Sequence, residues 1–200
     1  SLWYLPNQQE YASLIVELEF DQALVTYAGA PRRVWAVYNI SLSSEDEEAL
    51  NIAIRYVIEG KVATRLPESH SITFNPAPQS DNDNKLWFMN KLGENVSPLD
   101  VVKNGSIHQH AVSVQDYSLV YKGTNTQIAI TSQDVAVVIP GLPIPFPVPL
   151  PTGQDKEPNV SKYGFHFNLY NNIWGTNYIM WYPFKNEDAN FMCRFHVKIQ

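Results

Sequence analysis

The sequence predicts an all-β protein built as an antiparallel β-sandwich with few or no helices. About a dozen segments alternate apolar and polar residues with a period of two, the pattern of strands that bury one face. Turn signals rich in Gly, Pro, Asn and Asp separate them at intervals of roughly 8 to 15 residues. Aromatic residues make up 12% of the 200 residues, and 14 prolines are present. This composition favours strands and loops over helices.

The expected strands begin near the N-terminus. Residues 11–20 (YASLIVELEF) alternate clearly, and residues 34–40 (VWAVYNI) are mostly apolar, as in a sandwich core. Residues 23–27 are short and β-prone, and Gly29 with Pro31 ends them. Residues 50–59 fit a helical face and a strand equally well by spacing, and their Ile and Val content favours the strand.

The second half of the chain continues the pattern. Pro67 interrupts the segment after Gly60, so Glu68 to His70 is expected at a bend. Further strands are expected at residues 71–74, 86–88, 107–114, 117–121, 127–131, 135–139, 165–170 and 191–199. Residues 139–151 (IPGLPIPFPVPLP) are expected to form an extended strap or loop within one domain that spans residues 1–200.

Residues 163–184 (YGFHFNLYNNIWGTNYIMWYPF) are the most distinctive stretch. Phe165, Phe167 and Leu169 should share one face of a strand, with His166, Asn168 and Tyr170 on the other. An Asn-Asn turn and a second aromatic run follow. This stretch is either core plus turn or a platform on which sugars stack. The candidate sugar-binding residues are Asn171, Asn172, Trp174, Asn177, Trp181 and Tyr182.

Charge and hydropathy exclude two classes of partner. The formal net charge is −6 and the pI is about 5.3, and Arg32-Arg33 is the largest basic cluster, which argues against nucleic-acid binding. Apolar runs fall short of the roughly 18 residues that span a bilayer, so no membrane segment is expected.

Cysteine and sequon content bear on the compartment. Cys193 is the single cysteine, so no intrachain disulfide forms, and we expect an inert buried thiol. The N-glycosylation candidates are Asn39, Asn104 and Asn159, while Pro98 weakens the sequon at Asn95. These sequons indicate a glycosylated protein of the secretory pathway. The abrupt start at Ser1 suggests a piece of a larger protein.

Chemistry-bearing residues are present without a diagnostic spacing. The carboxylates contain no pair that would single out a glycosidase site. His108 and His110 could share a strand face, but the sequence fixes no third metal ligand, so we expect no metal and no cofactor in this segment. Arg65, Glu68 and His70 surround the Pro67 bend. They form either a local ion pair or a hydrogen-bonding rim for a sugar or a neighbouring domain.

Three stretches resemble a known group of proteins. They are residues 63–76 (ATRLPESHSITFNP), residues 90–110 (from NKLG through SPLDVV and NGS to HQH), and residues 166–182 (HFNLYNNIWGTNYIMWY). In this order they resemble the C-terminal region of large proteins that carry an N-terminal domain like that of glycoside hydrolase family 38, the α-mannosidases. The resemblance covers roughly residues 50–200, and the proline tract departs from it.

The resemblance implies a galactose-mutarotase-like supersandwich. It also implies that the zinc ion and the catalytic residues belong to an N-terminal domain outside this chain. The expected function is therefore that of a non-catalytic sandwich that packs on or supports that catalytic domain. The alternative is a carbohydrate-binding or structural module. A polysaccharide lyase would need a Tyr/His pair near an Arg, for which Tyr117, His108 and Arg65 are available.

Overall fold

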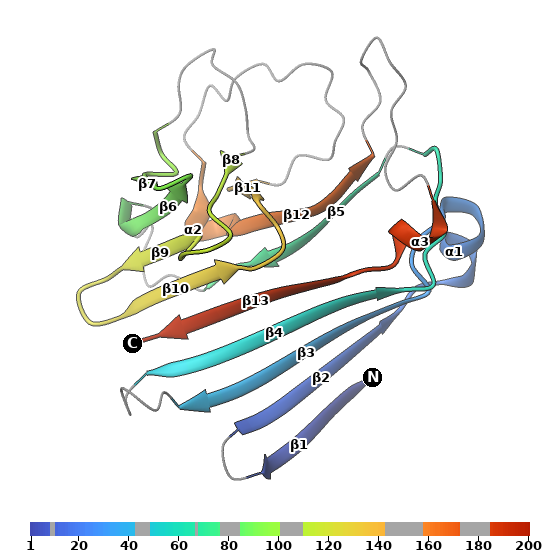
Figure 1. The fold of residues 1–200 in the computed structure, drawn as a ribbon, viewed down its shortest axis with the longest axis horizontal. Helices are drawn as coiled ribbons and strands as arrows, with labels where there is room; N and C mark the ends of the chain where they lie inside the picture. The colour runs from blue at the N-terminus through green and yellow to red at the C-terminus, as the bar shows by residue number, and fades with distance from the viewer. Residues whose placement is uncertain are drawn as a thin grey trace.

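The computed structural model describes residues 1–8, 11–42, 49–66, 68–76, 85–100, 110–142, 158–172 and 185–200. Two antiparallel sheets and three short helices are formed by these residues. The predicted all-β antiparallel sandwich is confirmed. Figure 1 shows the long strands of the larger sheet side by side, with β5, β12 and β11 toward one side of it.

The larger sheet has nine strands in the order β1-β2-β3-β4-β13-β10-β9-β6-β7. Its strands are β1 (Leu2–Gln8), β2 (Tyr11–Glu19), β3 (Arg33–Leu42), β4 (Leu50–Glu59), β6 (Trp87–Lys91), β7 (Glu94–Val96), β9 (Leu119–Lys122), β10 (Gln127–Ser132) and β13 (Met192–Ile199). The β3–β4 ladder runs from Arg33↔Glu59 to Leu42↔Leu50. The strand interpretation of residues 50–59 is thus confirmed.

The smaller sheet has four strands in the order β5-β12-β11-β8. They are β5 (Glu68–Phe74), β8 (His110–Ala111), β11 (Val137–Pro140) and β12 (Phe165–Asn172). Two predictions are wrong here. Glu68 to His70 continue β5 rather than bending, and Asn171-Asn172 continue β12 rather than turning, because the two segments pair with each other. That ladder supplies the backbone hydrogen bonds that a turn would leave unmade.

The main core fills the space between the sheets. Phe165 and Phe167 of β12 are fully buried. The Phe167 ring packs edge-on against Phe74, and its centre lies 5.3 Å from the centre of the Phe195 ring in β13. The core residues of the larger sheet come from β4, β13, β10, β9 and β6, and include Ile54, Val197, Ile130, Leu119 and Trp87. The smaller sheet therefore covers that half of the larger one.

Among the described residues, no second sheet covers the remaining half of the same face. Cross-strand partners share a face, so Leu18 lies on the same side as buried Val34, its partner in β3. Four large apolar side chains of this face are exposed: Leu2 (66%), Tyr4 (64%), Leu18 (51%) and Leu42 (68%). We call this set the open face. In Figure 1, β1 and β2 lie on the side of the molecule away from the smaller sheet.

An irregularity in β12 changes which residues face the core. The register between β12 and β5 shifts between Asn168 and Tyr170. As a result Tyr170 packs with Val34 and Ile58 of the larger sheet in a second core cluster. The sequence placed it with His166 and Asn168, and this is wrong because a β-bulge inserts a residue that breaks the period of two.

The helices are short, and one replaces an expected strand. Helix α1 (Gln22–Ala28) occupies the segment that its β-prone residues had marked as extended. The Asp21 carboxylate accepts a hydrogen bond from the Ala23 N–H, and Gly29 ends the helix at a φ of 68°. These two caps outweigh the β-propensity of the residues between them. Helices α2 (Val160–Tyr163) and α3 (Asn186–Ala189) are single turns.

Candidate functional site

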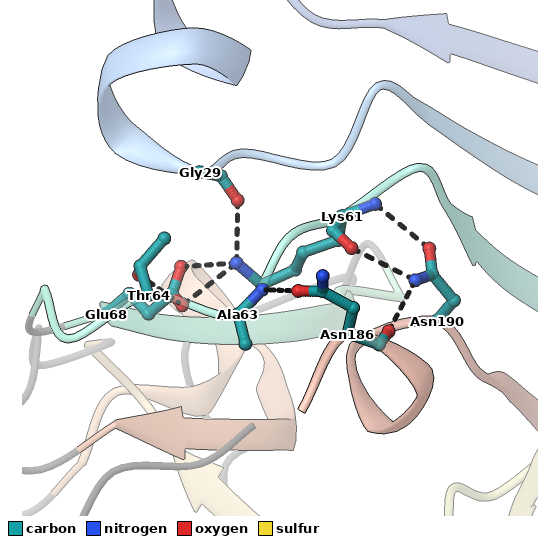
Figure 2. Close-up of polar contacts among 7 residues, drawn as sticks. All are labelled: Gly29, Lys61, Ala63, Thr64, Glu68, Asn186 and Asn190. Atoms are coloured by element: carbon teal, nitrogen blue, oxygen red, sulfur yellow. Dashed lines mark hydrogen bonds and ion pairs between the residues drawn. The ribbon is translucent and has the colours of Figure 1, made fainter. Parts of the chain in front are cut away.

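Lys61 lies at the centre of a buried polar cluster at one end of the sandwich. Its side chain is fully buried, although it is a charged residue in the segment between β4 and β5. The ammonium Nζ donates to the Gly29 carbonyl at 2.7 Å and lies 2.9 Å and 3.0 Å from the two carboxylate oxygens of Glu68. It also lies 5.4 Å from the centre of the Tyr170 ring. Figure 2 shows these polar contacts converging from several elements.

The backbone around Lys61 is fixed by two amide side chains at α3. Asn190 accepts a hydrogen bond from the Lys61 N–H at 2.9 Å and donates one to the Lys61 carbonyl at 3.0 Å. Asn186 accepts from the Ala63 N–H at 3.0 Å (Figure 2). The cluster thus ties together the end of α1, the segment after β4, the start of β5, and α3.

Gly29 is required at this junction by close approach. Its φ of 68° lies in the left-handed region, and a Cβ there would overlap the Thr64 methyl group. Any other residue would therefore displace both the segment after β4 and the carbonyl that Lys61 uses.

His70 extends the cluster toward the core. Its Nε2 lies 2.8 Å from the Tyr56 hydroxyl, and its ring lies 5.4 Å from the ring of Tyr170. Burial and the nearby charge of Lys61 lower the pKa of His70 to about 4. Burial raises the pKa of Tyr56 to about 12, and it also raises the pKa of Tyr170. All three rings are therefore neutral near pH 7.

The geometry of the cluster is that of a structural junction. The lysine ammonium is bonded to a carboxylate and a carbonyl, and the histidine is bonded to a tyrosine, so each polar group already has a protein partner. Removing one member of a buried ion pair typically costs about 3–5 kcal/mol, because a charge is left without compensation. The cluster holds chain segments in place and presents neither a free base nor a free nucleophile.

The structure brings together two of the three residues predicted around the Pro67 bend. Glu68 and His70 both join the Lys61 cluster, while Arg65 has an exposed side chain. Glu68 forms an ion pair with Lys61, which is not one of the three residues among which the sequence suggested a local ion pair. The sequence did not single out Lys61, Tyr56 or Tyr170, because a lysine beside a turn glycine gives no signal of burial.

The predicted sugar-binding residues are mostly outside the described structure. The backbone of Asn171 and Asn172 lies in β12, paired with Ser69 and Glu68. The other sugar-binding candidates lie outside the described residues: Trp174, Asn177, Trp181 and Tyr182. The same is true of the glycosylation candidate Asn104, of His108, and of residues 143–157, which include most of the proline tract. The glycan-platform hypothesis stays a prediction.

Two of the three N-glycosylation candidates can be placed. Asn39 lies within β3, where its side-chain oxygen accepts a 2.7 Å hydrogen bond from the Ser13 hydroxyl. Asn159 is exposed and caps α2 by accepting the Lys162 N–H at 2.9 Å, which leaves its amide nitrogen outside that bond. A glycan on Asn159 would thus be compatible with the observed cap.

A pocket of about 290 Å³ lies where β11, β12 and β13 meet. Its lining includes Asp134, Asn168, Phe191 and Cys193. The Asp134 carboxylate accepts two hydrogen bonds from the Arg194 guanidinium, at 2.7 Å and 3.0 Å, which hold its pKa below the usual range. Burial raises the pKa of Cys193 to about 12, so the thiol is protonated and inert at neutral pH, as predicted.

The described residues show neither a metal-binding cluster nor a membrane-spanning helix. The residues that the structure describes contain no cluster of three or more His, Cys, Asp or Glu side chains that could hold a metal ion. Among these residues, no helix has the length and apolar character needed to cross a membrane.

Comparisons with known proteins find similarity to solved structures alone. No protein-family model matches the sequence, and no curated protein matches it. Among solved structures, the GalM/aldose epimerase homologue from C. elegans aligns with a TM-score of 0.48 and 10% identity. The alignment covers 100% of this chain and 68% of that one.

Proposed function

We propose that this chain is a non-catalytic β-sandwich domain of an α-mannosidase-like glycoside hydrolase, which packs on a catalytic domain outside this chain. The observation that carries the proposal is the open face. In this proposal the zinc ion and the catalytic residues belong to the partner domain, and the protein acts in the secretory pathway or the lysosome.

The open face has the character of a domain interface. Leu2, Tyr4, Leu18 and Leu42 share one face of the sheet and carry no charge. That face continues directly into the main core, where the smaller sheet covers it. Contiguous apolar surfaces of this kind mark sites of protein contact. Water is a poor partner for such a surface, and burying it under an apolar layer would gain about 25 cal/mol per Å².

The sequence motifs support a catalytic domain as the partner of the open face. Residues 166–182 and the two earlier stretches resemble the C-terminal region of family 38-like proteins, in which this type of sandwich accompanies a catalytic domain. The Lys61 cluster supports a non-catalytic role, because its polar groups bond to each other. Cys193 supports it as well, since its thiol is protonated at neutral pH.

The proposal is tested in the parent protein by cutting the chain between its domains. After a protease nick, the sandwich should stay bound to the catalytic domain, as measured by native mass spectrometry. Leu18→Lys together with Leu42→Lys should release it, because two charges would be buried against an apolar surface. The matched control is Leu92→Lys, an exposed leucine at the β6–β7 turn.

Two results would contradict the proposal. One is native material that consists of the 200-residue chain alone. The other is a nicked complex that survives the Leu18→Lys, Leu42→Lys double change as well as it survives Leu92→Lys. Hydrolysis of mannosides by the isolated chain would separately overturn the non-catalytic role.

A further inference from the structure

The two outer edges of the nine-stranded sheet differ in how they are protected. β7 is an edge strand of three residues, Glu94–Val96, that follows a tight turn and carries a charged residue. Short, charged edges of this type resist pairing with other chains. β1 is the opposite edge and spans Leu2–Gln8. It carries Leu2, Trp3, Tyr4 and Leu5 in succession, all exposed.

The hydrogen-bonding pattern shows which groups β1 presents at its free edge. Ser1 and Glu17 exchange both backbone hydrogen bonds, at 2.8 Å and 2.9 Å. Because bonded and non-bonded pairs alternate in an antiparallel ladder, Trp3 and Leu5 also bond to β2. The N–H and C=O groups of Leu2 and Tyr4 therefore point away from the sheet. In the described residues no strand lies on that side of β1.

Both faces of β1 are apolar, which is unusual for an edge. Leu2 and Tyr4 lie on the open face, and Trp3 lies on the opposite face, where it stacks on Trp35 with ring centres 5.6 Å apart. Strands with apolar residues on both faces are normally interior strands. The composition of β1 is therefore that of a strand with a neighbour on each side.

We propose that β1 pairs with β1 of a second copy of this chain, in antiparallel register with Trp3 opposite Trp3. In this register Leu2 of one copy faces Tyr4 of the other, and the outward groups of both residues meet as hydrogen-bonded pairs. The arrangement is self-complementary, as a two-fold interface requires. Residues 2–5 carry no charged side chain, so the pairing brings no like charges together.

The register also explains where pairing stops. Pro6 has no N–H to donate, and the pairing of β1 with β2 becomes irregular between Leu5 and Gln8, so the regular alternation ends at Leu5. The ladder between two copies is therefore confined to residues 1–5. On one face Trp3 of each copy would add to the Trp3–Trp35 stack, and on the other the two open faces would become continuous.

The test compares Tyr4→Pro with Tyr4→Ala by sedimentation velocity over a wide range of protein concentration. Both changes remove the tyrosine ring, but only proline removes the outward N–H, and neither touches the bonds from Trp3 and Leu5 to β2. Native protein should dimerise. Tyr4→Pro should raise the dimer dissociation constant roughly thirtyfold relative to Tyr4→Ala, since two hydrogen bonds are lost per dimer. Thermal unfolding of the two variants should match at protein concentrations where both are monomeric, which shows that proline leaves the fold intact.

Three outcomes would overturn the proposal. The native protein could stay monomeric at every concentration, or Tyr4→Pro could associate as tightly as Tyr4→Ala. In the third, Leu18→Lys abolishes association while Tyr4→Pro does not, which assigns the contact to the open face. Because Leu18→Lys tests the domain interface and Tyr4→Pro tests the edge, either proposal can fail while the other stands.

Discussion

The nine-stranded sheet has two halves that alternate in the same way and differ in what covers them. In β13, Phe195 and Val197 point to the main core and are 2% and 8% exposed. In β2, Leu18 occupies an equivalent position on the same face and is 51% exposed. Alternation thus tells which face of a strand is apolar. It does not tell whether this chain or another covers that face.

The first prediction compares how much a core residue under the smaller sheet and a residue of the open face contribute to the free energy of unfolding. Phe167→Ala should lower the free energy of unfolding by about 3–5 kcal/mol, because it leaves a cavity beside Phe74 and Phe195. Leu18→Ala should change it by less than about 1 kcal/mol, because Leu18 is half exposed. Urea denaturation measures both. Equal losses would show that the open face is packed in solution and that the two halves do not differ.

The second prediction concerns the Lys61 cluster, which closes the end of the covered half. Glu68→Gln should cost about 3 kcal/mol, because it leaves a fully buried ammonium without its counter-charge. Lys61→Met should cost less, because the Glu68 side chain is 20% exposed and water can compensate its charge. Urea denaturation of both variants shows which one loses more free energy of unfolding. A larger loss for Lys61→Met would contradict this account of burial.

The third prediction is a pH dependence from the same cluster. The pKa of His70 is lowered to about 4 in the folded state, below its ordinary value near 6.5. Between these values the unfolded chain binds a proton that the folded chain does not, so stability falls as pH falls from 6.5 to 4. His70 should contribute about 2 kcal/mol of this loss after allowance for its partial exposure.

Buried His166 and half-buried His196 also have lowered pKa values and add loss in the same direction. His70→Gln is therefore compared with the native chain across this range by urea denaturation. The variant should show a shallower fall in stability with pH. An unchanged slope would mean that His70 is not held neutral by the fold.

The smallest effect on stability is expected for substitutions in the open face. Leu18→Ser together with Leu42→Ser should leave the free energy of unfolding within about 1 kcal/mol, since both side chains are largely exposed. The same pair should lower binding of a dye that fluoresces on apolar surfaces. Leu92→Ser is the control, because Leu92 is exposed at a turn away from the open face. Equal dye binding by the native chain and the double variant would contradict the presence of a continuous apolar patch.

The fold was predictable from the sequence wherever local pattern decides it. The strand at residues 50–59 and the alternation of Phe165 and Phe167 followed from side-chain type and spacing. Helix α1 was missed because the caps at Asp21 and Gly29 make this segment helical. The sheet face on which Tyr170 lies was missed because a bulge shifts the register of β12. β1 was not identified as a strand, since its residues are apolar on both faces and show no alternation.

The candidate site was predictable only in part. Glu68 and His70 stood out because polar residues interrupted an apolar segment. Lys61 did not, because its burial depends on the Gly29 carbonyl and on Asn190, which lie 32 and 129 residues away in the chain. The exposure of Leu18 and Leu42 was equally beyond the sequence, since it depends on where the smaller sheet ends.

The central claim is that the open face is a buried interface in the parent protein. Hydroxyl-radical footprinting of the parent protein and of the isolated chain tests it most directly, with Leu18 and Leu42 as reporters and Leu92 as the exposed control. The account predicts strong labelling of Leu18 and Leu42 in the isolated chain, protection of both in the parent protein, and equal labelling of Leu92 in the two. Equal labelling of Leu18 and Leu42 in both samples would contradict it.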